Sequence, residues 1–147
     1  MDKNKSLGAS IDADLSFDAQ VNAVCRTCNY HIRALRHIRN NLPMDVAKTI
    51  ACSIAGSRLD YCNALLYGIS GTNIQKLQRV QNNLASVVLK APRQTSTEQM
   101  LLNLHWLPIE HRIRYKMSVL TYKSVRTDRR VLSGLHIRLS CCTVTLR

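Results

Sequence analysis

The sequence predicts an all-α, single-domain helical bundle of about five helices, with an N-terminal extended arm at 1–15 and an irregular tail at 127–147. Apolar residues recur at helical spacing through most of 16–126, which is the main sequence signal of amphipathic helices. Proline and glycine stand where these periodic segments begin and end. The length of 147 residues suits one domain, so we expect the helices to share one core.

The clearest helical segments lie in the middle of the chain. Residues 57–67 are apolar on nearly every side, which predicts a buried helix, and Gly68 should end it in the left-handed conformation. Thr72 and Gln75 have the spacing of a capping box and predict the start of the next helix, which Pro92 ends. The apolar positions of this second helix share one side, namely Ile74, Leu77, Val80, Leu84, Val87 and Val88.

Two more helices are predicted before this pair. Ser16 suits the N-cap of the first, which should run to about Asn40. Pro43 favours the first position of the second, which Gly56 should kink or end. The apolar face of the first helix consists of Phe17, Val21, Val24, Cys28, Leu35 and Ile38.

The C-terminal part of the domain is predicted to add a short helix and a long one. Ser96 and Gln99 repeat the capping-box spacing before the short helix, and Pro108 can begin the long one. The inward positions of the long helix should be Ile109, Ile113, Met117 and Leu120.

The two ends of the chain are predicted to differ from the helical domain. Residues 6–15 alternate between apolar and polar side chains, which predicts one extended strand. A lone strand is not stable, so it should pair with something else or lie across the helices as an arm. Residues 127–147 show no sustained period and are expected to be irregular.

The charge of the chain is strongly positive and unevenly distributed. The formal net charge is +12; residues 1–24 hold two Lys and four Asp, whereas 25–147 hold nineteen basic and five acidic residues. Such a field favours polyanions, of which nucleic acid and anionic membranes are the usual candidates. The alternative is an ordinary solvated surface.

The sequence contains no apolar run of the ~20 residues that a membrane-spanning helix requires, so we expect no membrane partner. The N-terminus has no apolar signal core. Six cysteines without a secretory segment favour a reducing compartment, where thiols stay free. We therefore expect a cytoplasmic or nuclear protein that is not secreted.

Three helices carry polar stripes that could donate to phosphate oxygens. Each stripe lies beside or opposite the apolar face of its helix, although a solvated helix face would look the same. The few aromatic residues are better explained by burial in the core, so base readout is not indicated. The candidate nucleic-acid-binding residues are Arg26, Arg33 and Arg36 in the first helix, Arg79, Asn83 and Lys90 in the central helix, and Arg112, Lys116 and Lys123 in the last.

No constellation of residues predicts catalysis, a metal site or a cofactor. Cys25, Cys28 and His31 have a spacing that metal sites use, but a closed zinc site needs a second pair, and none stands at a matching distance. Buried thiols are the simpler interpretation. Asp60 lies in an apolar segment, so we expect a structural ion pair with an arginine of another helix, rather than a catalytic role.

Five blocks of the sequence resemble one protein family. They span Leu7 to Arg126 in unbroken order and are similar to the segment that follows the polymerase core in non-LTR (LINE-type, jockey-like) retrotransposon reverse transcriptases. The blocks are LGASIDADLSFDAQV, CNYHIRALRHIR, IACSIAGSRLDYCNALLYG, IQKLQRVQNNLASVVL and LHWLPIEHRIRYKMSVLTYK.

The resemblance implies a fold and a function. The helices would correspond to the thumb and connection that hold template and primer, so the expected partners are RNA or an RNA–DNA hybrid, and a polymerase palm in the parent protein. The palm, with the catalytic aspartates of an RNA-directed DNA polymerase, would lie upstream of Met1. Ser86 stands where the family commonly has arginine, and the pattern ends after Arg126.

We therefore expect a non-catalytic reverse-transcriptase fragment with sequence-nonspecific affinity for nucleic acid. Two alternatives stay open. One is a helical protein–protein interaction module, because an interface that once faced a palm would leave apolar surface exposed. The other is the product of a decayed element with no selected function.

Overall fold

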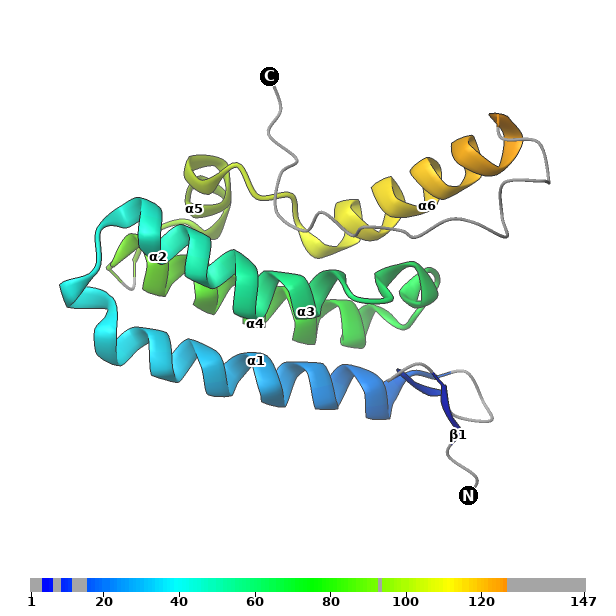
Figure 1. Cartoon of the computed structure of the whole chain (residues 1–147), viewed down its shortest axis with the longest axis horizontal. Coiled ribbons are helices and arrows are strands. Elements are labelled where there is room, and N and C mark those ends of the chain that lie inside the picture. The colour runs from blue at the N-terminus through cyan, green and yellow to red at the C-terminus, as the bar shows by residue number, and fades with distance from the viewer. Residues whose placement is uncertain (1–3, 7–8, 12–15, 93, 127–147) are drawn as a thin grey trace.

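Helix α4, Gly71–Leu89, lies at the centre of the fold, between α1 on one side and α5 and α6 on the other (Figure 1). The structure is a computed structural model that describes residues 4–6, 9–11, 16–92 and 94–126. It confirms the predicted all-α, single-domain bundle. The remaining elements are α1 (Asp18–Ile38), η1 (Arg39–Asn41), α2 (Met44–Ala51), η2 (Cys52–Gly56), α3 (Ser57–Asp60), η3 (Asn63–Leu66), α5 (Thr97–Leu104) and α6 (Ile109–Arg126).

The N-terminal arm contains two strands where one was predicted. Strand β1, Asn4–Ser6, pairs antiparallel with β2, Ala9–Ile11, so that Asn4 lies opposite Ile11. The partner strand that β2 requires is therefore β1, which lies at the start of the predicted alternating segment and just before it. Strand β2 contacts α1. The predicted irregular tail at 127–147 lies outside the described residues.

Helix α1 begins and ends slightly inside its predicted limits. Ser16 Oγ accepts a hydrogen bond of 3.5 Å from the Asp18 amide, but the cap position itself is Phe17, which has a left-handed φ of 55°. At the other end, Ile38 is 47% exposed and does not join the predicted apolar face. Ile32, which lies on the same side of the helix as Val21 and Cys28, is buried instead.

Helices α2 and α3 form one continuous path from Met44 to Asp60, joined by the π-helical segment η2. Pro43 is the N-cap of the path, one position before the first helical position that was predicted for it. Gly56 has helical φ and ψ of −58° and −46° and does not end the path. The path stops at Tyr61, which is extended with ψ of 121°, and Cys62 after it adopts a left-handed φ of 54°.

The predicted helix over 57–67 is therefore wrong. A helix that is apolar on every side needs burial on every side, whereas the bundle covers this segment on one side only. The break turns Leu66 into the core and leaves Tyr61 and Leu65 outside, 43% and 47% exposed. Gly68 does take the predicted left-handed conformation, with φ of 82°.

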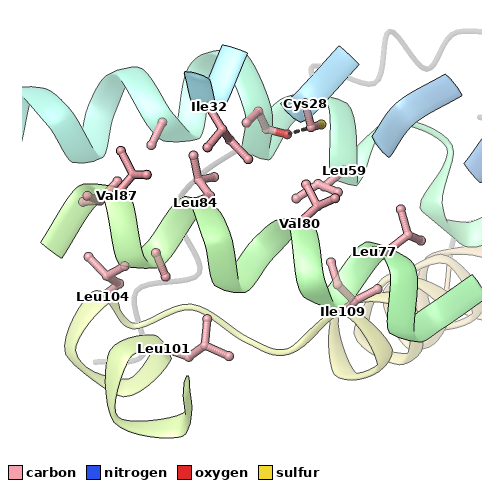
Figure 2. Packing of buried hydrophobic residues seen from close by; sticks show 14 of the residues in the cluster. Cys28, Ile32, Leu59, Leu77, Val80, Leu84, Val87, Leu101, Leu104 and Ile109 are labelled. Carbon is pink, nitrogen blue, oxygen red and sulfur yellow. Dashed lines mark hydrogen bonds between the residues drawn. The ribbon is translucent and has the colours of Figure 1, made fainter. Parts of the chain in front are cut away.

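Helix α4 starts at a different cap from the one predicted. Ser70 Oγ accepts a hydrogen bond from the Asn73 amide at 3.4 Å. The predicted capping box at Thr72 and Gln75 is therefore wrong, because the helix is capped two residues, about half a turn, earlier. The helix ends at Lys90, which is left-handed with φ of 51°, and Pro92 follows as predicted. The predicted apolar stripe is buried except for Ile74, which is half-buried (Figure 2).

Helices α1 and α4 pack against each other and run parallel. Asn73 Nδ2 donates to Asp18 Oδ1 at 2.6 Å near the start of both helices, and the Arg39 side chain reaches the Val88 carbonyl near their ends. Between them, Lys76 Nζ lies 3.5 Å from Asn22 Oδ1. The α2–α3 path supplies the return that a parallel pair of helices requires.

The C-terminal helices attach to the opposite side of α4. Gln81 Nε2 donates to the Leu107 carbonyl at 2.8 Å, and Gln78 Oε1 accepts from the Ile109 amide at 2.9 Å, which satisfies one of the free N–H groups at the start of α6. Ser96 precedes α5 as predicted, but its side chain makes no capping hydrogen bond.

Helix α6 is only partly inside the core. Ile109 and Ile113 are buried as predicted, Met117 is half-buried, and Leu120 is 37% exposed. The C-terminal half of the helix extends beyond the rest of the bundle (Figure 1). The prediction that Leu120 points into a core is therefore wrong, because no other described element reaches that far.

Candidate nucleic-acid interface

The first predicted stripe lies on the exposed side of α1. Arg26, Arg33 and Arg36 are all exposed, and none of them forms an ion pair within the described part of the chain. At about 100° per residue, the three side chains fall within roughly 80° of one another around the helix. Their neighbour Asn22 lies in the same sector and meets Lys76 of α4.

The second predicted stripe lies on α4 and contains one cation that the sequence analysis omitted. Arg79, Asn83 and Lys90 are exposed, and Ser86 between them is half-buried. Lys76 precedes them within the same sector of about 60°. Lys76 Nζ is held beside α1 by Asn22 and also lies 3.3 Å from Asn73 Oδ1. Its position about two turns before Asn83 was the signal that could have revealed it.

The structure brings these two stripes together. Because α1 and α4 are parallel, and Lys76 meets Asn22, the exposed sector of α4 adjoins the arginine-bearing sector of α1. Ten residues from Arg26 to Arg36 correspond to a helix length of about 15 Å. We call this surface the α1–α4 basic face; its cations are Arg26, Arg33, Arg36, Lys76, Arg79 and Lys90.

The third predicted stripe is not part of this face. Helix α6 attaches to α4 through Gln78, which lies about 200° around α4 from Lys76. Lys116 is half-buried and Lys123 is exposed, on the far side of α4 from α1. Arg112 is already engaged in an ion pair. Of the nine candidates, six therefore belong to the stripes of α1 and α4, one is paired, and two are lysines of α6.

The ion pair predicted for Asp60 is present. Asp60 Oδ2 contacts Arg112 Nη2, and the two side chains are 23% and 19% exposed. Asn63 Nδ2 lies 3.5 Å from the other carboxylate oxygen, while Asn63 Oδ1 is buried and has no hydrogen-bond partner among the described residues. The pair ties the end of α3 to α6, two segments that are far apart in sequence. Asp60 therefore has a structural role.

Arg39 is a buried arginine that the sequence analysis did not single out. It is 6% exposed. Its Nε and Nη2 donate to the Val88 carbonyl at 2.8 and 2.6 Å, and its Nη1 donates to the Leu42 carbonyl at 2.8 Å. It thus satisfies a free carbonyl at the C-terminal, negative end of α4. Position 39 lies five helical turns after Val21, on the core side of α1, and this spacing was the available signal.

The cysteines behave as core residues. Cys28 is fully buried and its Sγ lies 3.8 Å from the Ala55 carbonyl oxygen (Figure 2). Burial raises the pKa of the Cys28 thiol to about 11, and burial also raises the pKa of Cys25. A raised pKa keeps the proton on sulfur at neutral pH and so disfavours a thiolate ligand. Within residues 16–92 and 94–126, no three His, Cys, Asp or Glu side chains gather as a metal site would require.

A small hollow between α1 and α3 contains no catalytic arrangement. Its lining is mainly apolar and includes Phe17, Val24, Leu59 and Leu77, with Arg58 at its margin. An active site needs several polar groups that converge on one point. No carboxylate is part of this lining.

Comparisons with protein-family models, with curated proteins and with solved structures find no match for this chain. In the described residues, none of the helices combines the length and the apolar character needed to cross a bilayer. The α1–α4 basic face is therefore the feature of this chain that points to a function.

Proposed function

We propose that this chain is a helical nucleic-acid-binding module that corresponds to the thumb and connection of a retrotransposon RNA-directed DNA polymerase. In this proposal the α1–α4 basic face holds the phosphates of an RNA template or an RNA–DNA hybrid. The carrying observation is that two cationic stripes, far apart in sequence, adjoin on one surface. Lysines and arginines placed at random on the surface would not be expected to gather on adjoining sides of two parallel helices.

The charges on the face are not neutralised by carboxylates of the same domain. Residues 16–92 and 94–126 contain fourteen Lys and Arg but only five Asp and Glu. Two of those carboxylates are paired with arginines outside the face, Asp60 with Arg112 and Glu110 with Arg114, and Asp18 is hydrogen-bonded to Asn73. The positive field of the face is thus left for an anionic ligand.

The arrangement supports binding to the backbone rather than reading of sequence. A surface about 15 Å long faces about four phosphates of one strand, at 3.4 Å per nucleotide. Lysine and arginine contacts to phosphate fix the position of a nucleic acid but carry no base information. The proposal includes no catalytic step, metal or cofactor; polymerisation would belong to the palm of the parent protein.

The test is the salt dependence of binding to a labelled RNA–DNA hybrid, measured by fluorescence anisotropy. The variant Arg26→Gln/Arg33→Gln should lower the slope of log affinity against log salt by about 1.4 to 1.8, at 0.7 to 0.9 per lost phosphate contact. The control Lys48→Gln/Arg58→Gln removes the same charge from α2 and α3, outside the basic face, and should leave the slope nearly unchanged.

Equal effects of the two variants would show that only net charge matters, and the basic face would lose its special role. If the arginine variant keeps the affinity and slope of the parent, α1 does not touch nucleic acid. The alternative of a protein–protein interaction module would then be favoured by the exposed apolar residues of α6.

A further inference from the structure

The exposed tyrosines contradict the expectation that the aromatic residues pack in the core. All five tyrosines of the chain lie at the surface, with exposed fractions from 43% to 70%. Two of them, Tyr115 and Tyr122, are on α6 and are 50% and 60% exposed. An exposed phenol ring on a strongly basic protein offers a flat surface on which a base can stack.

The two tyrosines of α6 belong to a repeat. Tyr115-Lys116 recurs as Tyr122-Lys123, seven residues later. Seven residues are almost two helical turns, so the two rings lie within about 20° of one another around the helix and about 10.5 Å apart along it. Arg126 adds a third cation, with its guanidinium carbon 5.3 Å from the centroid of the Tyr122 ring. We call these five residues the Tyr–Lys face.

The charge of the Tyr–Lys face selects an anionic ligand. Residues 111–126 contain no carboxylate, and Glu110, at the start of α6, is paired with Arg114. A second copy of this chain, itself at +12, would be repelled. The half of α6 that carries Tyr122 and Arg126 also extends beyond the other described elements (Figure 1).

We propose that the Tyr–Lys face binds single-stranded nucleic acid, with unpaired bases stacked on Tyr115 and Tyr122 and phosphates held by Lys116, Lys123 and Arg126. This inference rests on the proposed function, because it treats the chain as a nucleic-acid-binding module, but it uses a separate helix. The strand must be unpaired, since a duplex hides the faces of its bases. The two rings are about 10.5 Å apart along the helix, so each can take a different base of one strand.

The experiment compares two hybrids by fluorescence anisotropy. One is blunt-ended; the other carries a single-stranded extension of about six nucleotides, long enough to reach both rings, in an RNA and a DNA version. At about fivefold per stacked base, the parent protein should bind the extended hybrid about 25-fold more tightly than the blunt one. Tyr115→Leu/Tyr122→Leu should remove this preference, while Tyr115→Phe/Tyr122→Phe, which keeps both rings, should retain it.

Tyr67→Leu is the control, because Tyr67 is 62% exposed but belongs to neither α6 nor the α1–α4 basic face. It should keep the preference. An unchanged preference in the double leucine variant, or a lost one in the phenylalanine variant, would overturn the inference while blunt-hybrid binding still supports the basic face. If the parent binds neither hybrid, the proposed function itself fails.

A measurement on the parent protein alone guards against a misfolded variant. A 2-aminopurine placed in the extension changes its fluorescence when it stacks on another ring. Binding should therefore change the emission of a probe in the extension and leave a probe in the duplex unaffected. An unchanged emission from the extension at saturating protein would overturn the inference without any substitution.

Discussion

Replacing Arg39 should destabilise the domain more than replacing any exposed arginine. Its guanidinium is 6% exposed and donates to the carbonyls of Val88 and Leu42. Arg39→Met keeps most of the aliphatic volume but leaves both carbonyls without this donor. Hydrogen bonds from charged groups contribute about 1.5–3 kcal/mol each, but the variant is also relieved of the cost of burying a cation, so we expect a net loss of about 2–3 kcal/mol.

The assay is urea denaturation followed by circular dichroism. With a denaturant slope of about 1–3 kcal/mol/M, the loss should lower the midpoint by roughly 0.7–3 M. The control is Arg36→Met, the same chemical change at an exposed position three residues earlier, in α1, which should fall within about 0.5 kcal/mol of the parent. If the two variants unfold at the same urea concentration, Arg39 does not cap α4 and the reasoning is refuted.

Three further predictions follow from the contacts of the described residues. A double-mutant cycle on Asp60→Asn and Arg112→Gln should give a coupling of about 1 kcal/mol, the upper end for exposed ion pairs, because the two side chains are only about one-fifth exposed; strict additivity would contradict it. The pKa of Cys28 is about 11 in the folded protein, above the ordinary 9.0, so the folded state holds the thiol proton more tightly than the unfolded state does. This difference stabilises the fold below pH 9, and the stabilisation should be lost as pH rises through 11. The Cys28→Ala variant should lack that decline, and identical pH profiles would contradict the assignment. A chelator should leave the helical circular dichroism unchanged, whereas melting would reveal a structural metal.

Much of the helical architecture could be predicted because it depends on local periodicity. The apolar stripe of α4, the start of α6 after Pro108 and the left-handed Gly68 all follow from spacing and backbone chemistry. The helix break at Cys62 could not be predicted, because the segment is apolar all round and only the tertiary structure decides which side is covered. The prediction that Leu120 is buried was wrong for a related reason: α6 extends beyond the helices against which it packs.

Part of the candidate site, too, could be predicted from the sequence and part could not. The stripes on α1 and α4 could each be read from sequence, but their union depends on the parallel register shown by Lys76 and Asn22. Asp60 was assigned correctly, since a carboxylate in an apolar segment requires a cation. Arg39 was missed because arginine is assumed to face solvent. The exposed tyrosines were missed because aromatic residues are assumed to face the core.

The central claim is that the α1–α4 basic face contacts nucleic acid, and NMR of the arginine side chains tests it most directly. The Nε–Hε resonances would be followed while an RNA–DNA hybrid is added to the whole chain. The resonances of Arg26, Arg33, Arg36 and Arg79 should shift together and saturate, whereas Arg58 on α3 should stay in place. Unchanged resonances for all four arginines, or a larger shift at Arg58, would contradict the account.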